Sequence, residues 1–345
     1  MVGRRRKINW PLRIIGGLAA VAIILAVALG TVLFETALRP SNLVGFRLLS
    51  IPDPGNPPIS ASVWYPTNAK PGFVFLGFSG ERVAKDAPII GDGLPLIIIS
   101  HGTGGGPPSH ADTALALAGA GFVVIAPMHP GDNYQEDGAV GTAHWLPDRA
   151  QNIKRVADYM LTEWDGRAHL KPDRIGVFGF SAGATTALIA IGGEPDLSML
   201  APHCRTQPEF VCILFPAANL AQLSARTDWT HDSRIKAAVI AAPGLGFAFS
   251  PSGLSHVTAA VQLWQGDQDQ TVPYATNAGI VRRSLPSPPE FHAVVGADHY
   301  SFLVPCYILG PPRICQDRPG FDRAAFHDAF NNTVVSFFRA RLAGE

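Results

Sequence analysis

The sequence predicts an α/β fold with a mostly parallel central sheet flanked by helices, preceded by one N-terminal transmembrane helix. Short, wholly apolar, β-branched runs such as residues 96–99 are typical of strands that are buried on both faces. These runs alternate with stretches of helical apolar spacing, which indicates βαβ units and a parallel sheet. An uncharged run from Ile14 to Phe34 precedes them. As a helix it would be roughly 31 Å long, enough to cross a bilayer.

The residues around this apolar run predict its orientation. Arg4, Arg5, Arg6, Lys7 and Arg13 all lie before it, so the positive-inside rule places the N-terminus in the cytoplasm. Residues 1–40 are then a basic stub and a signal-anchor helix. Residues 41–345 form one domain outside the cytoplasm, periplasmic or extracellular. The alternative is a cleaved signal peptide and a secreted protein.

Composition limits the class of protein. The 345 residues are 47% hydrophobic, which is ample for a large buried core. With 27 basic and 27 acidic residues the formal net charge is zero, and no basic run is interleaved with aromatic residues. We therefore expect no nucleic-acid partner. Oligomeric state is not predicted.

The expected elements follow in chain order. Strands are expected in an initial hairpin within residues 45–65 and then at residues 96–99, 122–126, 174–178, 235–241, 259–264 and 291–295. Helices are expected at residues 111–120, 149–164, 184–191 and 324–342. The proline-rich stretch 192–234 interrupts the alternation, and we expect it to form a lid-like insertion over the sheet.

The segment Gly179-Phe180-Ser181-Ala182-Gly183 carries the strongest chemical signal. A serine hydroxyl is a weak nucleophile, so it must be presented on a tight turn beside a base and beside donors for an oxyanion. The G-x-S-x-G pattern is informative here because an apolar strand precedes it and a helix follows it. Ser181 is the expected nucleophile. The alternative is a serine that only caps the helix.

The glycine-rich loop from His101 to Gly106 follows an earlier strand, where the second oxyanion donor usually originates. We assign the two donors to the backbone N–H groups of Thr103 and Ala182. A phosphate cradle is the alternative, but neither nucleotide-binding glycine pattern is satisfied. No cofactor is therefore expected.

The acid and the base should follow later strands, with the histidine last. Two carboxylates, Asp269 and Asp267, compete for the role of the acid. Asp269 is the expected acid, because a residue a few positions past a strand end can turn back over the sheet edge, whereas Asp267 would more naturally brace the loop. His299, in Asp298-His299-Tyr300, is the expected base.

Other residues near these motifs are expected to line the pocket or to support it. His101 is expected to orient its loop. Possible pocket residues are His101, Gly102, His129, Phe180 and Tyr300. His327 lies in the final helix, where we expect no role in the chemistry.

The four cysteines form two close pairs, Cys204 with Cys212 and Cys306 with Cys315. In an exported chain, two local disulfides are expected. The spacings do not fit a zinc site, so no metal is expected.

The order Ser181, Asp269, His299, with His101-Gly102 upstream, resembles the α/β-hydrolase superfamily. Within it, the chain is similar to the dienelactone-hydrolase-like and platelet-activating-factor-acetylhydrolase-like esterases over most of residues 45–340. The narrower resemblance rests on residues 63–66, 100–102, 129–131, 179–183 and 298–302.

The chain departs from both relatives. The true dienelactone enzymes use cysteine where Ser181 stands, which argues against dienelactone as substrate. The acetylhydrolases carry histidine and phenylalanine where this chain has Phe180 and Ala182, so phospholipid specificity does not transfer.

The predicted function is a serine carboxylic-ester hydrolase that acts through an acyl-enzyme on a small or medium ester. An amidase or peptidase of the same fold is the first alternative. A catalytically silent binding domain is the second.

Overall fold

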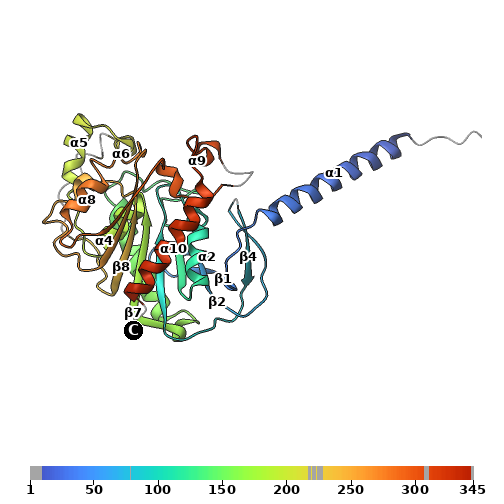
Figure 1. The fold of residues 1–345 in the computed structure, drawn as a ribbon, viewed down its shortest axis with the longest axis horizontal. Coiled ribbons are helices and arrows are strands. Elements are labelled where there is room, and N and C mark those ends of the chain that lie inside the picture. Colours follow the sequence, from blue (N-terminus) through green and yellow to red (C-terminus); the bar gives the residue numbers. More distant parts are fainter. Residues whose placement is uncertain are drawn as a thin grey trace, which may run out of the picture.

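A computed structural model describes residues 10–77, 79–216, 219, 223, 228–306 and 311–342. Within these ranges, side chains are described for every residue except 11–13, 79 and 312. Within these residues one sheet of ten strands forms the centre of the molecule (Figure 1), in the order β10-β9-β8-β7-β5-β6-β2-β1-β4-β3. The predicted mostly parallel sheet flanked by helices is confirmed.

The strands are β1 Val44–Ile51, β2 Ile59–Pro66, β3 Gly72–Leu76, β4 Ser79–Lys85, β5 Leu94–Ser100, β6 Val123–Pro127, β7 Leu170–Phe180, β8 Ile235–Ala241, β9 Ala260–Gly266 and β10 Glu290–Val294. The α-helices are α1 Trp10–Glu35, α2 Ala111–Gly119, α3 Trp145–Thr162, α4 Ala182–Ala190, α5 Leu200–Thr206, α6 Phe210–Leu214, α8 Ala278–Ser284, α9 Pro312–Cys315 and α10 Arg323–Leu342. The 3₁₀ turns are η1 Pro107–His110, η2 Arg167–His169, η3 Leu197–Met199, η4 Gly246–Ala248 and η5 His299–Phe302.

Strands β5 to β10 are parallel to one another, and β1 to β4 extend the sheet on one side through antiparallel and parallel pairs. The central strands are buried on both faces; in β6 every residue is buried. This burial explains why they are continuous apolar runs without alternation.

Helices cover both faces of the sheet. Helices α2 and α10 pack on one face through a core that includes Leu117, Phe330 and Phe338. Helices α3, α4 and α8 pack on the other face through a core that includes Ile153 and Leu188. Parallel strands end at one sheet edge, so the loops after β5, β7, β9 and β10 meet there.

Several features differ from the prediction. The hairpin β3–β4 was not predicted, although it is the end of the sheet nearest α1. Strand β7 begins at Leu170, earlier than expected, and α3 begins at Trp145. The insertion 192–234 contains α5 and α6 in place of a purely irregular stretch, and its residues 217, 218, 220–222 and 224–227 lie outside the described residues.

Helix α1 projects away from the body (Figure 1). Its segment Ile14–Glu35 has a mean hydropathy of 2.6 and is not buried by the rest of the chain. It is long and apolar enough to cross a membrane, and a signal sequence would have the same properties. The basic residues 4–7 lie outside the described residues, as does the side chain of Arg13.

Candidate active site

The turn between β7 and α4 presents Ser181. Its φ of 56° lies in the left-handed region, which is costly for a residue with a side chain. The two flanking glycines permit the turn because the backbone packs closely there. A Cβ on Gly183 would lie 1.9 Å from the Ser100 carbonyl oxygen, and one on Gly179 would lie 2.2 Å from the Gly183 carbonyl oxygen. The turn therefore holds the hydroxyl at the sheet edge.

His299 and Asp269 lie in line with this hydroxyl. The Ser181 Oγ is 3.0 Å from His299 Nε2, and His299 Nδ1 is 2.8 Å from Asp269 Oδ2. In the tautomer with a proton on Nδ1, the imidazole donates to the carboxylate and accepts the Ser181 proton at Nε2. The three residues come from three different loops, and the fold brings them together in one relay.

The two carboxylates of the β9 loop have different partners. Asp269 is buried, and its other oxygen accepts the backbone N–H groups of Thr271 and Val272, both at 2.9 Å. Asp267 instead accepts the Gly296 N–H at 2.8 Å and lies at the surface. The geometry places Asp269, and not Asp267, against His299.

The loop after β5 carries the expected oxyanion donor. The N–H of Gly104 donates to Asp132 at 2.8 Å, and that of Gly105 donates to the Gly102 carbonyl at 3.0 Å. Within the described part of the chain, Thr103 N–H has no such acceptor, and Thr103 lines the same cavity as Ser181. Ala182 is the first residue of α4, so its N–H lacks an intrahelical partner.

A buried ion pair supports this loop from behind. Arg149 and Asp132 are 1% and 0% exposed, and their side chains lie 2.5 Å apart. The Arg149 guanidinium also donates to the His101 carbonyl and to Thr186 of α4. Asp132 accepts the Trp145 indole N–H at 2.6 Å. The pair thus connects the loop, α3 and α4.

Two buried histidines belong to the same support. His101 Nδ1 lies 2.8 Å from the Gly102 carbonyl, and its Nε2 accepts the His129 backbone N–H at 3.2 Å. Burial, and then the charge of Arg149, lowers the pKa of His101 to about 3. Burial followed by the charges of Arg149 and His101 also lowers the pKa of His129. Both rings are therefore neutral at physiological pH, and this agrees with an orienting role for His101.

A cavity of about 260 Å³ opens over Ser181. Its lining includes Gly102, Phe180 and Tyr300, together with Thr103 and His299. The prediction that His101 and His129 line the pocket is wrong, because both are fully buried behind the loop. The wall is completed by Gly77, Gly104, Gly105, Gly106, Pro108, Ser109, Tyr134, Phe210, Thr271, Leu303, Val304, Pro305, Cys306, Pro311, Ile314 and Cys315. Among the described residues that line the cavity, none is Asp, Glu, Lys or Arg.

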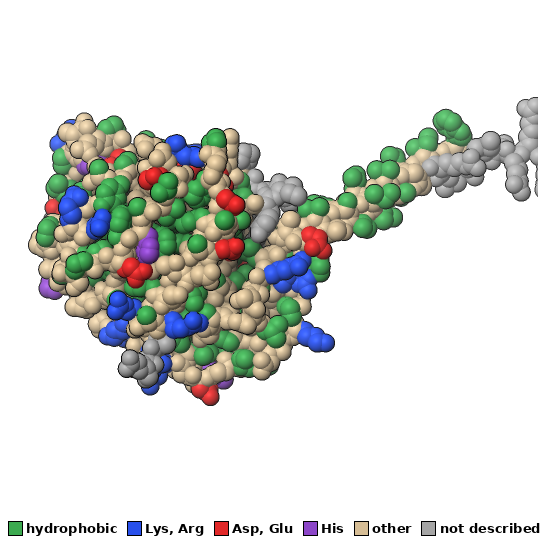
Figure 2. Space-filling view, viewed as in Figure 1, with side chains coloured by type: hydrophobic (Ala, Val, Ile, Leu, Met, Phe, Trp, Pro, Cys, Tyr) green, Lys and Arg blue, Asp and Glu red, His purple; other side chains and the backbone are tan. Residues whose placement is uncertain are grey.

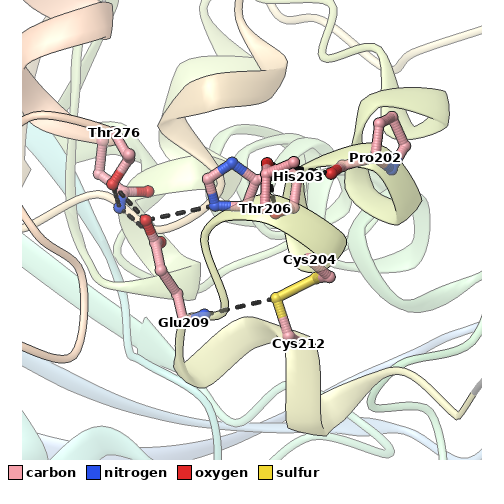
Figure 3. Close-up of a disulfide and its surroundings, with 8 residues drawn as sticks. Pro202, His203, Cys204, Thr206, Glu209, Cys212 and Thr276 are labelled. Carbon is pink, nitrogen blue, oxygen red and sulfur yellow. Dashed lines mark hydrogen bonds and ion pairs between the residues drawn. A yellow bond between two sulfur atoms is a disulfide. The ribbon is translucent and has the colours of Figure 1, made fainter.

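The insertion contributes Phe210 to this wall. Cys204 and Cys212 form a disulfide that joins α5 to α6 (Figure 3). Between them, Glu209 extends to the loop after Asp269, where it accepts the Thr276 hydroxyl and the Asn277 amide. Glu209 therefore connects the insertion to the loop that follows Asp269 and fixes the position of the neighbouring Phe210.

The second disulfide, Cys306 to Cys315, lies in the cavity wall itself. Both expected disulfides are thus present in the structure, and no cysteine is free. Cysteines that are bonded to each other in this way cannot also bind zinc.

A second histidine and carboxylate support the turn of His299. His327 Nδ1 lies 2.6 Å from Asp112 Oδ2, and its Nε2 lies 2.9 Å from the Ser301 carbonyl oxygen in η5. Both ring nitrogens face acceptors, so the ring satisfies both only in its protonated form. Asn331 adds a 2.7 Å hydrogen bond to Asp112. His327 therefore supports the turn of His299 from behind, and its hydrogen bonds go to Asp112 and Ser301 and not to the reacting groups.

Comparison with solved structures identifies the architecture. A ferulic acid esterase from Streptomyces cinnamoneus superposes with a TM-score of 0.60 at 17% identity, over 89% of this chain and 92% of that one. The chain is an α/β-hydrolase in fold. At this identity the likeness concerns the fold alone.

A sequence-family model agrees. The model of the dienelactone hydrolase family matches residues 85–208, which is over a third of this chain. The matched stretch contains the loop after β5 and the Ser181 turn, and it ends before Asp269 and His299. The predicted resemblance to this group is supported over that stretch. Among curated proteins, none matches the sequence.

Sequence reasoning missed the supporting residues. Arg149 is only the first residue of an expected helix, and Asp132 is not among the residues predicted from the sequence. No local signal pairs them, because their contacts join elements distant in sequence. Glu209 and His327 were missed for the same reason.

Proposed function

We propose that this α/β-hydrolase is a serine carboxylic-ester hydrolase that acts on a small or medium-sized, uncharged ester. The observation that carries the proposal is the relay from Ser181 through His299 to the buried Asp269, at the base of a cavity. Such an arrangement generates an alkoxide-like nucleophile at neutral pH. The ferulic acid esterase and the dienelactone hydrolase match support the hydrolase class.

The first half of the reaction forms an acyl-enzyme. Ser181 Oγ attacks the ester carbonyl carbon while its proton passes to His299 Nε2. The N–H groups of Thr103 and Ala182 hold the resulting oxyanion, and Asp269 stabilises the imidazolium. When the tetrahedral adduct collapses, the bond to the alcohol oxygen breaks, and Nε2 returns its proton to that oxygen.

The second half repeats these steps with water. His299 removes a proton from water, the hydroxide attacks the acyl carbon, and the bond to Ser181 Oγ breaks as Nε2 reprotonates it. The carboxylic acid product leaves, and the residues return to their starting state. The side chains and water supply every proton, so this route uses no further group.

The lining of the cavity supports the substrate class. A volume of about 260 Å³ is at the lower limit for ligand pockets and suits one side of a small or medium ester. The described lining holds no charged residue. A carboxylate or ammonium group on the substrate would therefore lose its bound water in the cavity without gaining an ion-pair partner, which is unfavourable. The cavity therefore favours neutral groups on both sides of the ester bond.

The N-terminal helix supports a location for this activity. We propose that residues 1–40 anchor the protein with a cytoplasmic N-terminus and that the catalytic domain 41–345, with its lid-like insertion 192–234, works outside the cytoplasm. The two disulfides are consistent with an oxidising compartment. Secretion after cleavage of the helix is the alternative.

One experiment tests the chemistry. A fluorophosphonate probe should label the wild-type protein and not Ser181→Ala, and p-nitrophenyl esters should be hydrolysed by the wild type alone. Circular dichroism should show both proteins folded, because only one hydroxyl is lost. Hydrolysis of matched anilides faster than esters would favour the amidase alternative. Ester turnover by Ser181→Ala within tenfold of wild type would exclude the proposed nucleophile.

A further inference from the structure

The hairpin β3–β4 presents an aromatic face next to the base of α1. In the register of this hairpin Phe73 pairs with Arg82 and Phe75 pairs with Gly80, so these four residues share one face. Phe73 and Phe75 are 41% and 55% exposed. Large apolar side chains that gather at the surface mark a contact site.

This face is the one on which α1 ends. The Arg82 guanidinium lies 4.3 Å from the ring centre of Phe34, the penultimate residue of α1, which is itself 43% exposed. After the helix, Leu38 N–H donates to the Gly80 carbonyl and Leu38 carbonyl accepts the Arg82 N–H. The described part of α1 is covered with hydrophobic side chains up to this junction (Figure 2). Helix and hairpin therefore meet at this junction, which also carries the exposed ion pair of Glu35 and Arg39.

The opposite face of the hairpin is fixed to the body. Glu81 is fully buried and accepts the Trp64 indole N–H at 2.8 Å, and Val83 is also buried. The aromatic face cannot turn inward without breaking these contacts. It stays on the outside, beside α1.

We infer that the aromatic face, made of Phe34, Phe73, Phe75 and Arg82, contacts the surface of a lipid bilayer. The inference rests on the proposed membrane anchoring by α1. Trp10 and Phe34 lie roughly 36 Å apart along that helix, which places one aromatic group in each interfacial region of a bilayer whose hydrocarbon core is about 30 Å thick. Phe73 and Phe75 then lie at the interface level of Phe34, and Arg82 lies where lipid phosphates are found.

The position of the hairpin has a consequence for the cavity. Gly77, in the turn between β3 and β4, lines the cavity and packs against Pro108, another lining residue. The hairpin that contacts the bilayer thus also contributes Gly77 to the cavity wall. An ester dissolved in the interfacial region would reach Ser181 along this part of the wall.

Fluorescence in vesicles tests the contact directly. The full-length chain carries an environment-sensitive fluorophore on Phe75→Cys, with Val295→Cys as the matched control, because Val295 is 82% exposed and follows the opposite edge strand β10. The four native cysteines are paired and do not compete for label. In phosphatidylcholine–phosphatidylglycerol vesicles we expect nitroxide lipids labelled near the headgroup to quench position 75 several-fold more strongly than position 295.

Equal quenching at the two positions, while the chain floats with the vesicles, would overturn the inference. Failure to float would overturn it through its premise. The fluorophore at position 75 could instead become shielded from solvent as the protein concentration rises, whether or not lipid is present. That result would assign the aromatic face to a contact with a second copy of the chain and would also overturn the inference.

A second measurement separates this surface from the ester chemistry. The double variant Phe73→Ser/Phe75→Ser should hydrolyse water-soluble p-nitrophenyl acetate at the wild-type rate and should lose activity several-fold on an ester dissolved in vesicles. Equal rates on the vesicle-borne ester would contradict the role of the hairpin in substrate access. If the wild type did not hydrolyse p-nitrophenyl acetate, the proposed function would be contradicted, whereas the quenching result would be unaffected.

Discussion

Two aspartates in one loop have divided roles because of their neighbours. Asp269 is held by two backbone N–H groups and by Gln265, whose amide lies 3.2 Å from its Oδ2. These donors fix the orientation of the carboxylate, so it can orient His299 and stabilise its protonated form. Within the described residues, the Asp267 carboxylate accepts one hydrogen bond, from the Gly296 N–H.

The two residues can be separated by matched substitutions. Asp269→Asn should lower kcat by a factor on the order of 10⁴, because the amide favours the wrong tautomer of His299. Asp267→Asn should remain within a few-fold of wild type. Steady-state hydrolysis of a p-nitrophenyl ester measures both. The reverse pattern would exchange the roles of the two residues.

The Asp112–His327 pair should make stability depend on pH. Burial alone would raise the pKa of the Asp112 carboxyl, but the charge and hydrogen bond of His327 and the hydrogen bond of Asn331 hold that pKa below its usual 3.8. A lowered folded-state pKa stabilises the protein above the unfolded value, and this stabilisation disappears as pH falls through the folded value. Wild type should therefore lose more unfolding free energy between pH 7 and pH 3 than Asp112→Asn.

Urea denaturation at several pH values gives that comparison. The control is Asp328→Asn, which removes an exposed carboxylate one residue from His327. It should follow the wild-type pH dependence. If Asp112→Asn also followed it, the pair would make no pH-dependent contribution to stability.

The strands and helices of the core were predictable from the sequence, whereas the β3–β4 hairpin and the residues that support the site were not. The strand before Ser181 and the helix after it have a local signal, since glycines and an apolar run specify the turn. Hairpin β3–β4 was missed because residues 72–85 are interrupted by glycine, and their pairing with β1 joins segments far apart in the chain. The choice of Asp269 rested on loop position. Its backbone donors became visible only in three dimensions.

At the scale of an element, the disulfide Cys306–Cys315 joins the segment that follows η5 to the end of α9, and both cysteines line the cavity. It closes a short loop, so Cys306→Ala/Cys315→Ala should lower the unfolding free energy by about 2–3 kcal/mol in the chain-entropy model. The variant should also raise KM, because both cysteines line the cavity. Thermal denaturation and ester kinetics, measured at a temperature where the variant is folded, check the two effects.

The other disulfide gives a comparison for stability. Cys204 and Cys212 are separated by 8 positions and Cys306 and Cys315 by 9, so the two stability losses should be similar. An unchanged KM in Cys306→Ala/Cys315→Ala would show that the disulfide does not shape the cavity.

At the scale of the whole molecule, the sequence already predicted the α/β-hydrolase fold and a possible membrane span. Helix α1 is not buried by the rest of the described chain along Ile14–Glu35, and its last residues meet the body, where Phe34 contacts Arg82. If it remains attached, the full-length protein should resist extraction from membranes by alkaline carbonate, and a protease added outside spheroplasts should digest the catalytic domain. Deletion of residues 1–40 should release an active soluble protein.

Two outcomes would change this topology. A mature N-terminus beginning within or after α1 would favour the secreted form. Digestion of the catalytic domain only after the cells are opened would place it in the cytoplasm. The apolar length alone cannot distinguish these cases, since anchors and signal peptides share it.

The Arg149–Asp132 pair has a consequence for amide hydrogen exchange. Loop amides usually exchange quickly because they are exposed and weakly bonded. The Gly104 amide instead donates to a fully buried carboxylate whose partners lie in α3, so opening it would leave a buried charge incompletely paired. We expect this amide to exchange as slowly as those of the central strands. The loop that we propose holds the oxyanion would then open only together with the core.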